Sequence, residues 1–261
     1  MAWDVASVAA ELLRCEDERT DRPAFTDEWP ELDLDTGYEI QDRNLAARLA
    51  RGETLVGVKL GLTSKAKQRR MGVDVPFVAW LTDAMILPAG EPVPQSRLIH
   101  PRIEPEIVFV MRDRLSGPGV GCAAAMAAVG SVWGGAEVID SRYRDFRFTA
   151  GDVAADNASS AAFVTGPVGR PPSELDLSLE AVLVEVDGVV VDSATGAAVQ
   201  GHPGEALALA ANELARRGRA VVPGWIVLTG GMTDAVPAPP GVSVAMHFTN
   251  LGSIHVHGGE R

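Results

Sequence analysis

Three glutamates stand in sequence surroundings that would normally bury their side chains. Glu104 and Glu106 interrupt the apolar segment RIEPEIVFVM at 102–111, and Glu137 lies in GGAEVID among small and apolar residues. Residues two apart in a β-strand project from the same face, so Glu104 and Glu106 would lie side by side. Burying either carboxylate alone is costly, and like charges at that distance repel each other.

A divalent cation would resolve this electrostatic conflict. Oxygen ligands select Mg²⁺, Mn²⁺ or Ca²⁺ over Zn²⁺, and three protein ligands leave coordination positions for water or a chelating substrate. The alternative is that the glutamates lie on the solvent face of an edge strand, a position that Pro105 between them favours. The pattern alone therefore predicts either a metal site or a solvated edge strand.

The composition narrows the possible classes of function. Of the 261 residues, 46% are hydrophobic and 22% charged, a mixture that can bury a full core. The formal net charge of -12 makes nucleic acid and anionic membranes poor partners. No apolar run reaches the ~18 residues that span a bilayer, and the usual glycine-rich nucleotide-binding motifs do not occur. The acidic start and the separated Cys15 and Cys122 favour a cytoplasmic protein with two reduced thiols.

The predicted elements place the glutamates in a strand-rich body that follows a helical lead-in. Helices are expected over 5–13, 36–50 and 204–217, and a short one from Ser64 to Gly72. Strands are expected over 54–63, 102–111, 135–140, 177–186, 189–192, 225–229, 242–248 and 253–257, with a hairpin turn at Asp187–Gly188. Many strands, few helices and Gly/Pro-rich turns favour a curled mixed sheet or a sandwich.

Six sequence words, in this order, carry a resemblance to a known family. They are GVKLGLTSKAKQRRMGVDVP at 57–76, HPRIEPEIVFV at 100–110, EVIDSRYRDFRF at 137–148, DVAADNASSAAFVTG at 152–166, LTGGMTDAVP at 228–237 and NLGSIHV at 250–256. Together they closely resemble the 2-oxo-3-hexenedioate (4-oxalocrotonate) decarboxylase and 2-hydroxypenta-2,4-dienoate hydratase family, within the fumarylacetoacetate-hydrolase-like superfamily. The resemblance implies an α+β fold, a mixed β-roll or sandwich wrapped by helices. It further implies a helical N-terminal region at 1–75 and a catalytic β-roll at 76–261.

The resemblance also implies a metal site and a reaction. Glu104, Glu106 and Glu137 would hold Mg²⁺ or Mn²⁺, and the substrate would be a small 2-oxo dicarboxylate. The words SRYRDFRF, HPRIEPE and GGMTDAVP look more like the decarboxylase branch, which converts 2-oxo-3-hexenedioate to 2-hydroxypenta-2,4-dienoate and CO₂ in meta-cleavage catabolism of aromatic compounds. The alternatives are the hydratase, C–C hydrolysis of an acylpyruvate, and a non-catalytic subunit that supports such an enzyme. Family analogy also implies a homo-oligomer and a possible complex with the pathway hydratase.

Two cations are candidates for binding the substrate, and each has a structural alternative. Lys59, in GVKLG, would face the carboxylate or enolate oxygen; without the resemblance it would be interpreted as a surface lysine whose stem covers apolar residues. Arg142 would pair with a substrate carboxylate, or else with Asp140 or Asp145.

The remaining candidates are polar residues without a motif of their own. Asp156, in ADNASS, would orient the lysine or relay a proton, or would belong to an ordinary helix-ending turn. Ser160 would donate a hydrogen bond to the substrate, or would be a buried hydroxyl bonded to the backbone. Asp83 is a candidate for the site wall or for proton transfer. His255 and His257 share one face of the last strand and are interpreted as an exposed strand end, not as metal ligands.

Overall fold

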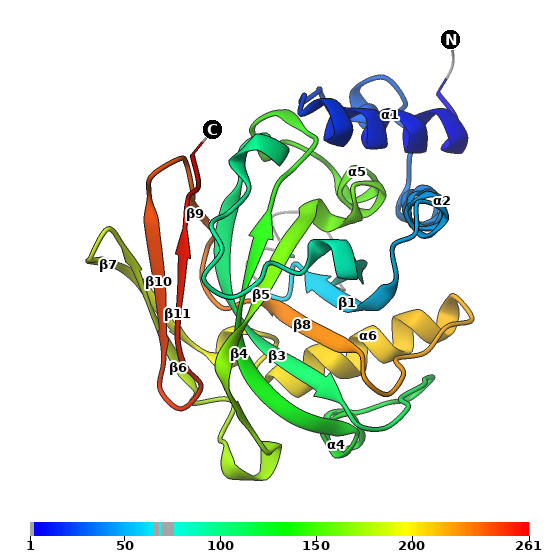
Figure 1. Ribbon diagram of the computed structural model, residues 1–261. Coiled ribbons are helices and arrows are strands. Elements are labelled where there is room, and N and C mark those ends of the chain that lie inside the picture. Colours follow the sequence, from blue (N-terminus) through cyan, green and yellow to red (C-terminus); the bar gives the residue numbers. More distant parts are fainter. Residues whose placement is uncertain (1–2, 65–67, 69–75, 261) are drawn as a thin grey trace.

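Two β-sheets packed against each other form the body of the protein, with helices at one end and along one side (Figure 1). The computed structural model describes residues 3–64, 68 and 76–260. The larger sheet has the order β2-β1-β8-β3-β4-β5, with β9 pairing to β3. Its strands are β1 (Leu55–Gly61), β2 (Phe77–Thr82), β3 (Arg102–Met111), β4 (Val129–Ile139), β5 (Ser160–Arg170), β8 (Ile226–Gly231) and β9 (Val236–Pro237). The β1–β8 pair is parallel and the other pairs are antiparallel, so the sheet is mixed.

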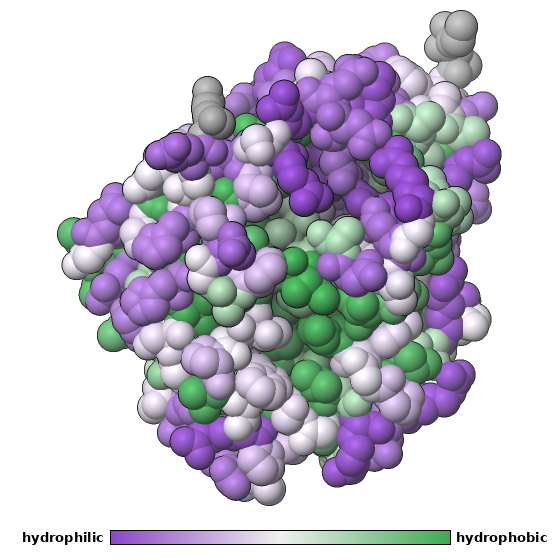
Figure 2. Space-filling view, viewed as in Figure 1, coloured by the Kyte–Doolittle hydropathy of each residue, from purple (hydrophilic) through white to green (hydrophobic). Residues whose placement is uncertain are grey.

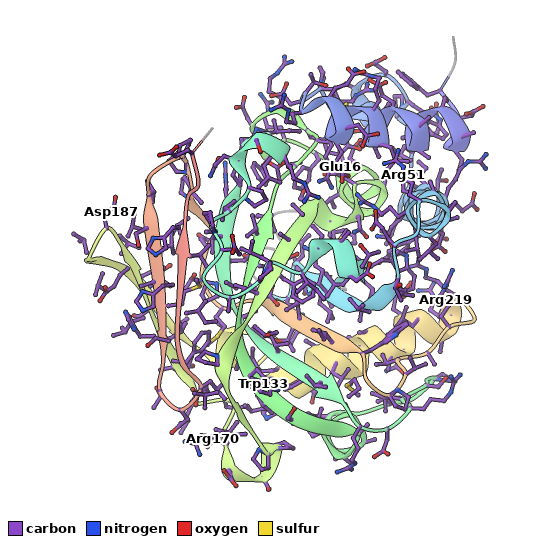
Figure 3. The ribbon with its side chains drawn as sticks, in the orientation of Figure 1. Glu16, Arg51, Trp133, Arg170, Asp187 and Arg219 are labelled. Atoms are coloured by element: carbon purple, nitrogen blue, oxygen red, sulfur yellow. The ribbon has the colours of Figure 1, made fainter. Side chains whose placement is uncertain are left out.

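The smaller sheet is a four-stranded antiparallel layer with the order β11-β10-β6-β7. Its strands are β6 (Ala181–Val186), β7 (Val189–Thr195), β10 (Ser243–Phe248) and β11 (Gly252–His257). The predicted turn at Asp187–Gly188 joins β6 to β7, and both of its residues have positive φ, 51° and 80°. Positive φ at both central residues is what a two-residue hairpin turn of this hand requires. Asp187 stands at its tip (Figure 3).

The helices divide into an N-terminal group and a group on the side of the larger sheet. Helices α1 (Val5–Glu18), α2 (Leu34–Ala50) and α5 (Ala150–Ala155) lie together, while α6 (Pro203–Arg216) packs with α4 (Cys122–Ala127) and against β8 and β2. Short 3₁₀ turns complete the set: η1 (Phe25–Asp27), η2 (Asp83–Met85), η3 (Gln95–Arg97), η4 (Arg144–Phe146), η5 (Asn157–Ser159), η6 (Pro172–Glu174) and η7 (Gly196–Ala198). Among the described helices none is long and apolar enough to cross a membrane.

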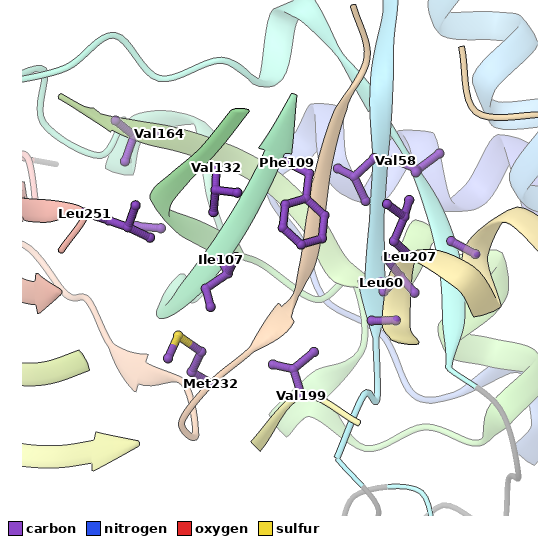
Figure 4. Packing of buried hydrophobic residues seen from close by; sticks show 14 of the residues in the cluster. Val58, Leu60, Ile107, Phe109, Val132, Val164, Val199, Leu207, Met232 and Leu251 are labelled. Atoms are coloured by element: carbon purple, nitrogen blue, oxygen red, sulfur yellow. The ribbon is translucent and has the colours of Figure 1, made fainter. Parts of the chain in front are cut away.

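The two faces of the larger sheet have different chemistry. Ile107 and Phe109 of β3 and Val132 of β4 point into the main core, together with Leu207 of α6 (Figure 4). The main core also includes residues of the smaller sheet. Because side chains alternate along a strand, Glu104 and Glu106 point to the opposite face. The larger sheet therefore has the apolar core on one face and the glutamates on the other.

The predicted mixed sheet, its helical wrapping and the helical N-terminal region are confirmed, whereas the edge-strand alternative for the glutamates is wrong. Strand β3 lies between β8 and β4, inside the sheet. The N–H and C=O of a residue point toward the same neighbouring strand, so the N–H that Pro105 lacks would have pointed where its carbonyl points. That carbonyl accepts the N–H of Met232, 2.9 Å away, where the pairing of β3 passes from β9 to β8. The proline's missing N–H therefore falls at this break in the ladder and not within continuous pairing.

The division at residue 75 stays a prediction. Strand β1, which precedes that boundary, is hydrogen-bonded to β2 and β8 within the larger sheet. Most of the short helix expected from Ser64 to Gly72 lies outside the described residues. Strands β2, β5 and β9 and the short helices α4 and α5 were not predicted.

Strand β1 has no room for a side chain at Gly57, where it pairs with β8. A Cβ built there would lie 1.9 Å from the carbonyl oxygen of Ile226 on the neighbouring parallel strand. We expect Gly57→Ala to destabilise the fold by about 1–3 kcal/mol, the usual cost of overpacking, because backbone cannot move aside as a flexible side chain would. Gly61→Ala, on the same strand, is the control, since a Cβ there would meet no atom closer than 3.4 Å, an ordinary van der Waals distance. Thermal unfolding of both variants checks this, and equal melting temperatures would contradict it.

Candidate metal centre

The three glutamates converge on one point of the larger sheet, on the face opposite the main core. Glu104 of β3 lies directly opposite Glu137 of β4 in the strand register, and Glu106 lies opposite Gly135. One carboxylate oxygen from each glutamate lies within 4.8 Å of the others. Glu106 and Glu137 are completely buried and Glu104 is 9% exposed. The sheet register, with its period of two, therefore brings together three oxygen ligands in a place closed to bulk water.

Two glycines at the end of β8 make room for these carboxylates. The backbone N–H of Gly230 donates to Glu106 Oε2 at 2.7 Å. A Cβ on Gly231 would lie 2.2 Å from Glu104 Oε2, so any side chain there would displace the carboxylate. Gly230 also has φ of 106°, a conformation that other residues rarely adopt. Both glycines belong to the sequence motif LTGGMT, but the sequence did not predict that their backbone lies against the glutamates.

Lys59 supplies the positive charge of the cluster. Its Nζ lies 3.1 Å from both Oε1 and Oε2 of Glu137 and donates to Oε2 and to the carbonyl oxygen of Ala158, at 3.1 and 2.7 Å. The Ala158 carbonyl is presented by the η5 turn, in which three consecutive residues have φ between 49° and 58°. Such left-handed conformations are strained for residues with side chains and persist where the surroundings impose them. The interpretation of Lys59 as a surface lysine is therefore wrong, since only 2% of the residue is exposed.

The charges of these four residues do not balance. Among these four described side chains, three carboxylates face one ammonium group. Burial, followed by the charges of Glu137 and Glu104, raises the pKa of Glu106 well above its ordinary value. Burial also raises the pKa of Glu137, although Lys59 opposes that effect. Glu106 Oε1 is buried without a hydrogen-bond partner among the described residues. A divalent cation would neutralise the remaining charge and provide that oxygen with a partner, so the residues fit the predicted metal.

Arg142 and Asp156 form a separate buried ion pair. The guanidinium binds the Asp156 carboxylate through Nε, the Asp156 carbonyl at 2.6 Å and the Asp140 carbonyl at 2.7 Å. Burial alone would lower the pKa of Arg142, but the charges of Asp156, Glu16 and Asp140 outweigh it and raise that pKa. Glu16 approaches from α1, on the side of α5 (Figure 3). Breaking such a pair typically costs 3–5 kcal/mol, because it leaves one charge buried without a partner.

This pair changes how the predictions for Arg142 and Asp156 are weighed. The donors of Arg142 are engaged within the protein, which leaves it poorly placed to bind a substrate carboxylate. Asp156 does not contact Lys59; its carboxylate accepts from Ser159 Oγ at 3.2 Å, and its carbonyl from the Ser159 N–H at 2.9 Å. Asp156 therefore holds the η5 turn whose Ala158 carbonyl holds Lys59, an indirect form of the predicted orientation.

The last two candidates differ in how they are placed. Ser160 is buried at the start of β5, and its Oγ makes one long contact, 4.0 Å, with Met85 Sδ. Asp83 is exposed in η2, where its carboxylate accepts the N–H of Thr54 at 2.8 Å. Thr54 precedes Lys59 by five residues along the strand, a distance of about 16 Å. The place of Asp83 in the site wall stays a prediction, and the distance from Lys59 gives it no support.

Comparison with known proteins agrees with this geometry. The chain is 40% identical over 250 residues to 4-oxalocrotonate decarboxylase of Pseudomonas sp. (strain CF600), covering 96% of this chain and 95% of that protein. Its structure matches that of 4-oxalocrotonate decarboxylase from Pseudomonas putida G7, complexed with magnesium and adipate. The TM-score is 0.95, with 40% identity over 97% of this chain and 96% of that one. The chain belongs to the 4-oxalocrotonate decarboxylase and 2-keto-4-pentenoate hydratase family.

Both branches of this family are represented among the relatives. A 2-keto-4-pentenoate hydratase of Burkholderia vietnamiensis (strain G4 / LMG 22486) is 36% identical over 250 residues, which cover 96% of this chain and 95% of that protein. No protein-family model matches the chain. The family resemblance drawn from the sequence words is thus confirmed by full-length relatives.

Glu106→Gln tests whether the buried charge is held for a metal. The raised pKa means that the folded, metal-free protein binds this proton more tightly than the unfolded chain does. Ionisation of Glu106 therefore destabilises the folded protein as the pH rises above 4.5, the ordinary pKa of a glutamate. At pH 7 in EDTA we expect the glutamine variant to be more stable than the parent by on the order of 1 kcal/mol, about 2–4 °C in melting temperature.

The same variant should lose the response to Mg²⁺. Mg²⁺ is expected to raise the melting temperature of the parent protein and to leave that of Glu106→Gln unchanged, as differential scanning fluorimetry would show. A glutamine variant that is less stable in EDTA than the parent would contradict the interpretation.

Proposed function

We propose that the protein catalyses the Mg²⁺- or Mn²⁺-dependent decarboxylation of 2-oxo-3-hexenedioate (4-oxalocrotonate) to 2-hydroxypenta-2,4-dienoate and CO₂. The observation that carries the proposal is the buried Glu104/Glu106/Glu137 cluster with Lys59 against it. The full-length similarity to 4-oxalocrotonate decarboxylases supports it. So does the magnesium and adipate complex of the Pseudomonas putida G7 enzyme, because adipate is a dicarboxylate with the substrate's chain length.

The three glutamates would hold the divalent cation, which supplies Lewis acidity toward a 2-oxo acid when bound. Loss of CO₂ breaks the C5–C6 bond, and its electron pair moves through the C3–C4 double bond onto the 2-oxo oxygen. Lys59 Nζ, fixed by Glu137 and Ala158, places a positive charge and a proton beside this developing negative charge. Protonation of that oxygen then gives the 2-hydroxydienoate.

An apolar layer next to the glutamates strengthens these electrostatic effects. Val108 follows Glu106 on the same face of β3, and Leu228 pairs with both Val108 and Lys59. These two residues pack with Leu81, Met85 and Phe163 in one buried cluster. Figure 2 shows apolar side chains gathered in the hollow of this face, over β3, β4 and β8. Charges interact more strongly where water is excluded, so the layer favours charge stabilisation by Lys59.

The other candidates receive narrower roles. Arg142 and Asp156 act as positioning residues that hold the η5 turn, and Ser160 remains the candidate hydroxyl donor. Asp83 remains an unsupported candidate. We also propose, by family analogy, a homo-oligomer and a complex with the pathway hydratase. The hydratase activity is the second candidate function, favoured by the 36% identity to a 2-keto-4-pentenoate hydratase.

CO₂ release from 2-oxo-3-hexenedioate separates these activities. We expect CO₂ release that stops in EDTA and returns when Mg²⁺ is added, because the buried carboxylates need a cation to hold the substrate. Release is followed by a coupled carbonate assay, with product analysis by NMR. Absence of CO₂ under every condition, together with conversion of 2-hydroxypenta-2,4-dienoate to 4-hydroxy-2-oxopentanoate, would assign the hydratase instead.

Lys59→Met tests the role of the lysine apart from metal binding. We expect kcat to fall by about 10²-fold, the cost of losing a donor to a developing oxyanion. Mg²⁺ affinity, measured by isothermal titration calorimetry, should not fall, because the variant removes a positive charge 3.1 Å from Glu137. Leu60→Met, on the core face of the same strand, is the control and should keep both properties. Loss of Mg²⁺ binding by Lys59→Met would show that the lysine instead maintains the site.

A further inference from the structure

The free edge of the larger sheet, at β2, is closed by side chains. The N–H of Val78 donates to the hydroxyl oxygen of Tyr38 at 3.2 Å, and the Val78 carbonyl accepts from the amide of Gln41 at 3.2 Å. Trp80 makes both of its bonds with one residue. Its N–H donates to Asn157 Oδ1 at 2.8 Å, and its carbonyl accepts from Asn157 Nδ2 at 2.9 Å. The amide of Asn157 therefore takes the place of a pairing strand at Trp80.

Asn157 is also the first residue of the η5 turn, which holds Lys59. Its φ is 50°, and Ala158 and Ser159 follow with 49° and 58°, although none of the three is glycine. Asparagine is one of the few residues with a side chain that adopt this left-handed conformation readily. The carbonyl of Ala158, one residue further along, accepts from Lys59 Nζ at 2.7 Å. The turn that receives the ammonium group therefore begins at the residue that is bonded to β2.

A short ring of contacts connects the Asn157 amide to this ammonium group. Trp80 pairs with Val58 in the antiparallel register of β1 and β2, and Val58 immediately precedes Lys59. The lysine side chain reaches back to Ala158, the residue that follows Asn157. Moving η5 away from β2 would therefore also move the Ala158 carbonyl away from the strand that carries the lysine.

The bonds of Asn157 differ from those that hold the other side of η5. The Arg142–Asp156 pair connects the start of the turn to the segment that follows β4. The two bonds of Asn157 connect the same turn to β2, the neighbour of the strand that carries Lys59. The turn is thus held from two directions, and Asn157 fixes its place relative to the lysine strand.

We infer that Asn157 is a positioning residue that fixes the ammonium group of Lys59 through the η5 turn and acts on turnover only through that lysine. The effect on turnover rests on the proposed function, in which Lys59 faces the developing oxyanion. A displacement of about 1 Å in such a group can lower a rate by about 10²-fold, so a lost positioning contact is measurable.

The position of the ammonium group is tested without turnover, in the metal-free protein. The chain has three lysines, so protein labelled with ¹⁵N-lysine gives few ammonium signals in NMR, and the signal absent from Lys59→Met is that of Lys59. Asn157→Gly removes the amide and leaves a residue that adopts the left-handed conformation without strain. We expect hydrogen exchange of the Lys59 ammonium to become about tenfold faster or more in this variant, because its acceptor is released. Unchanged exchange would overturn the inference.

Tyr38→Phe is the matched control for this measurement. It removes the hydroxyl that accepts from Val78 on the same edge strand and keeps the aromatic ring. Both the ammonium exchange and kcat should stay at the parent values, because the η5 turn keeps its own bonds. An equal effect of Tyr38→Phe and Asn157→Gly would show that any weakening of this edge disturbs the lysine, and it would also overturn the inference.

Kinetics in two backgrounds show whether Asn157 acts through Lys59. Asn157→Gly should lower kcat by about tenfold in the parent protein and have little further effect in Lys59→Met, because residues that act through one group are not additive. Its Mg²⁺ affinity in isothermal titration calorimetry should match that of the parent. An equal fall of kcat in both backgrounds would indicate a general loss of structure and would overturn the inference.

A second variant covers the case in which Asn157→Gly does not fold. Asn157→Asp keeps the acceptor for the Trp80 N–H but places an oxygen against the Trp80 carbonyl, and it should change the ammonium exchange and kcat in the same directions. No CO₂ release by the parent, with the exchange responding as expected, would overturn the proposed function and the effect on turnover. The assignment of Asn157 as the residue that positions Lys59 would then stand on the exchange result.

Discussion

The structure depends on three carboxylates buried together, with the Lys59 ammonium group beside them among the described residues. Burying carboxylates so close to one another is unfavourable for any fold, and this chain accommodates them through the shape of the site. The register of β3 and β4 puts Glu104 opposite Glu137, and the glycines of β8 leave room for Glu104 and donate an N–H to Glu106. These features converge on one position for a divalent cation. Repulsion among the carboxylates destabilises the metal-free protein, and its relief would contribute to the free energy of metal binding.

Stability and chemistry are linked through the strand period and one buried ion pair. Alternate residues of β3 serve the core and the metal centre, so a change of register would disrupt both together. The Arg142–Asp156 pair holds the left-handed η5 turn, whose Ala158 carbonyl fixes Lys59. Lys59 is therefore positioned by an ion pair whose hydrogen bonds within the described part of the chain do not involve the three glutamates.

The sequence predicted what local pattern and charge determine. Long apolar strands, the Asp187–Gly188 turn and the two N-terminal helices were found from periodicity, and the glutamates from their surroundings. Strand β5 contains glycine and proline and forms through its pairing with β4, and α5 is too short to show a helical period. The partner of Arg142 was misjudged because sequence shows which groups are charged but not which acceptors surround them.

The relation between the two branches of the family follows from where charge develops. Decarboxylation and hydration of these substrates both place negative charge on the 2-oxo oxygen, so under the proposed function the same glutamates and lysine would suit either reaction. The substrates differ at the distal end, where one has a carboxylate and the other an alkene terminus. Residues that distinguish them must therefore lie away from the metal centre. This is consistent with similar identities, 40% and 36%, to members of both branches, because most of the chain builds the part they share.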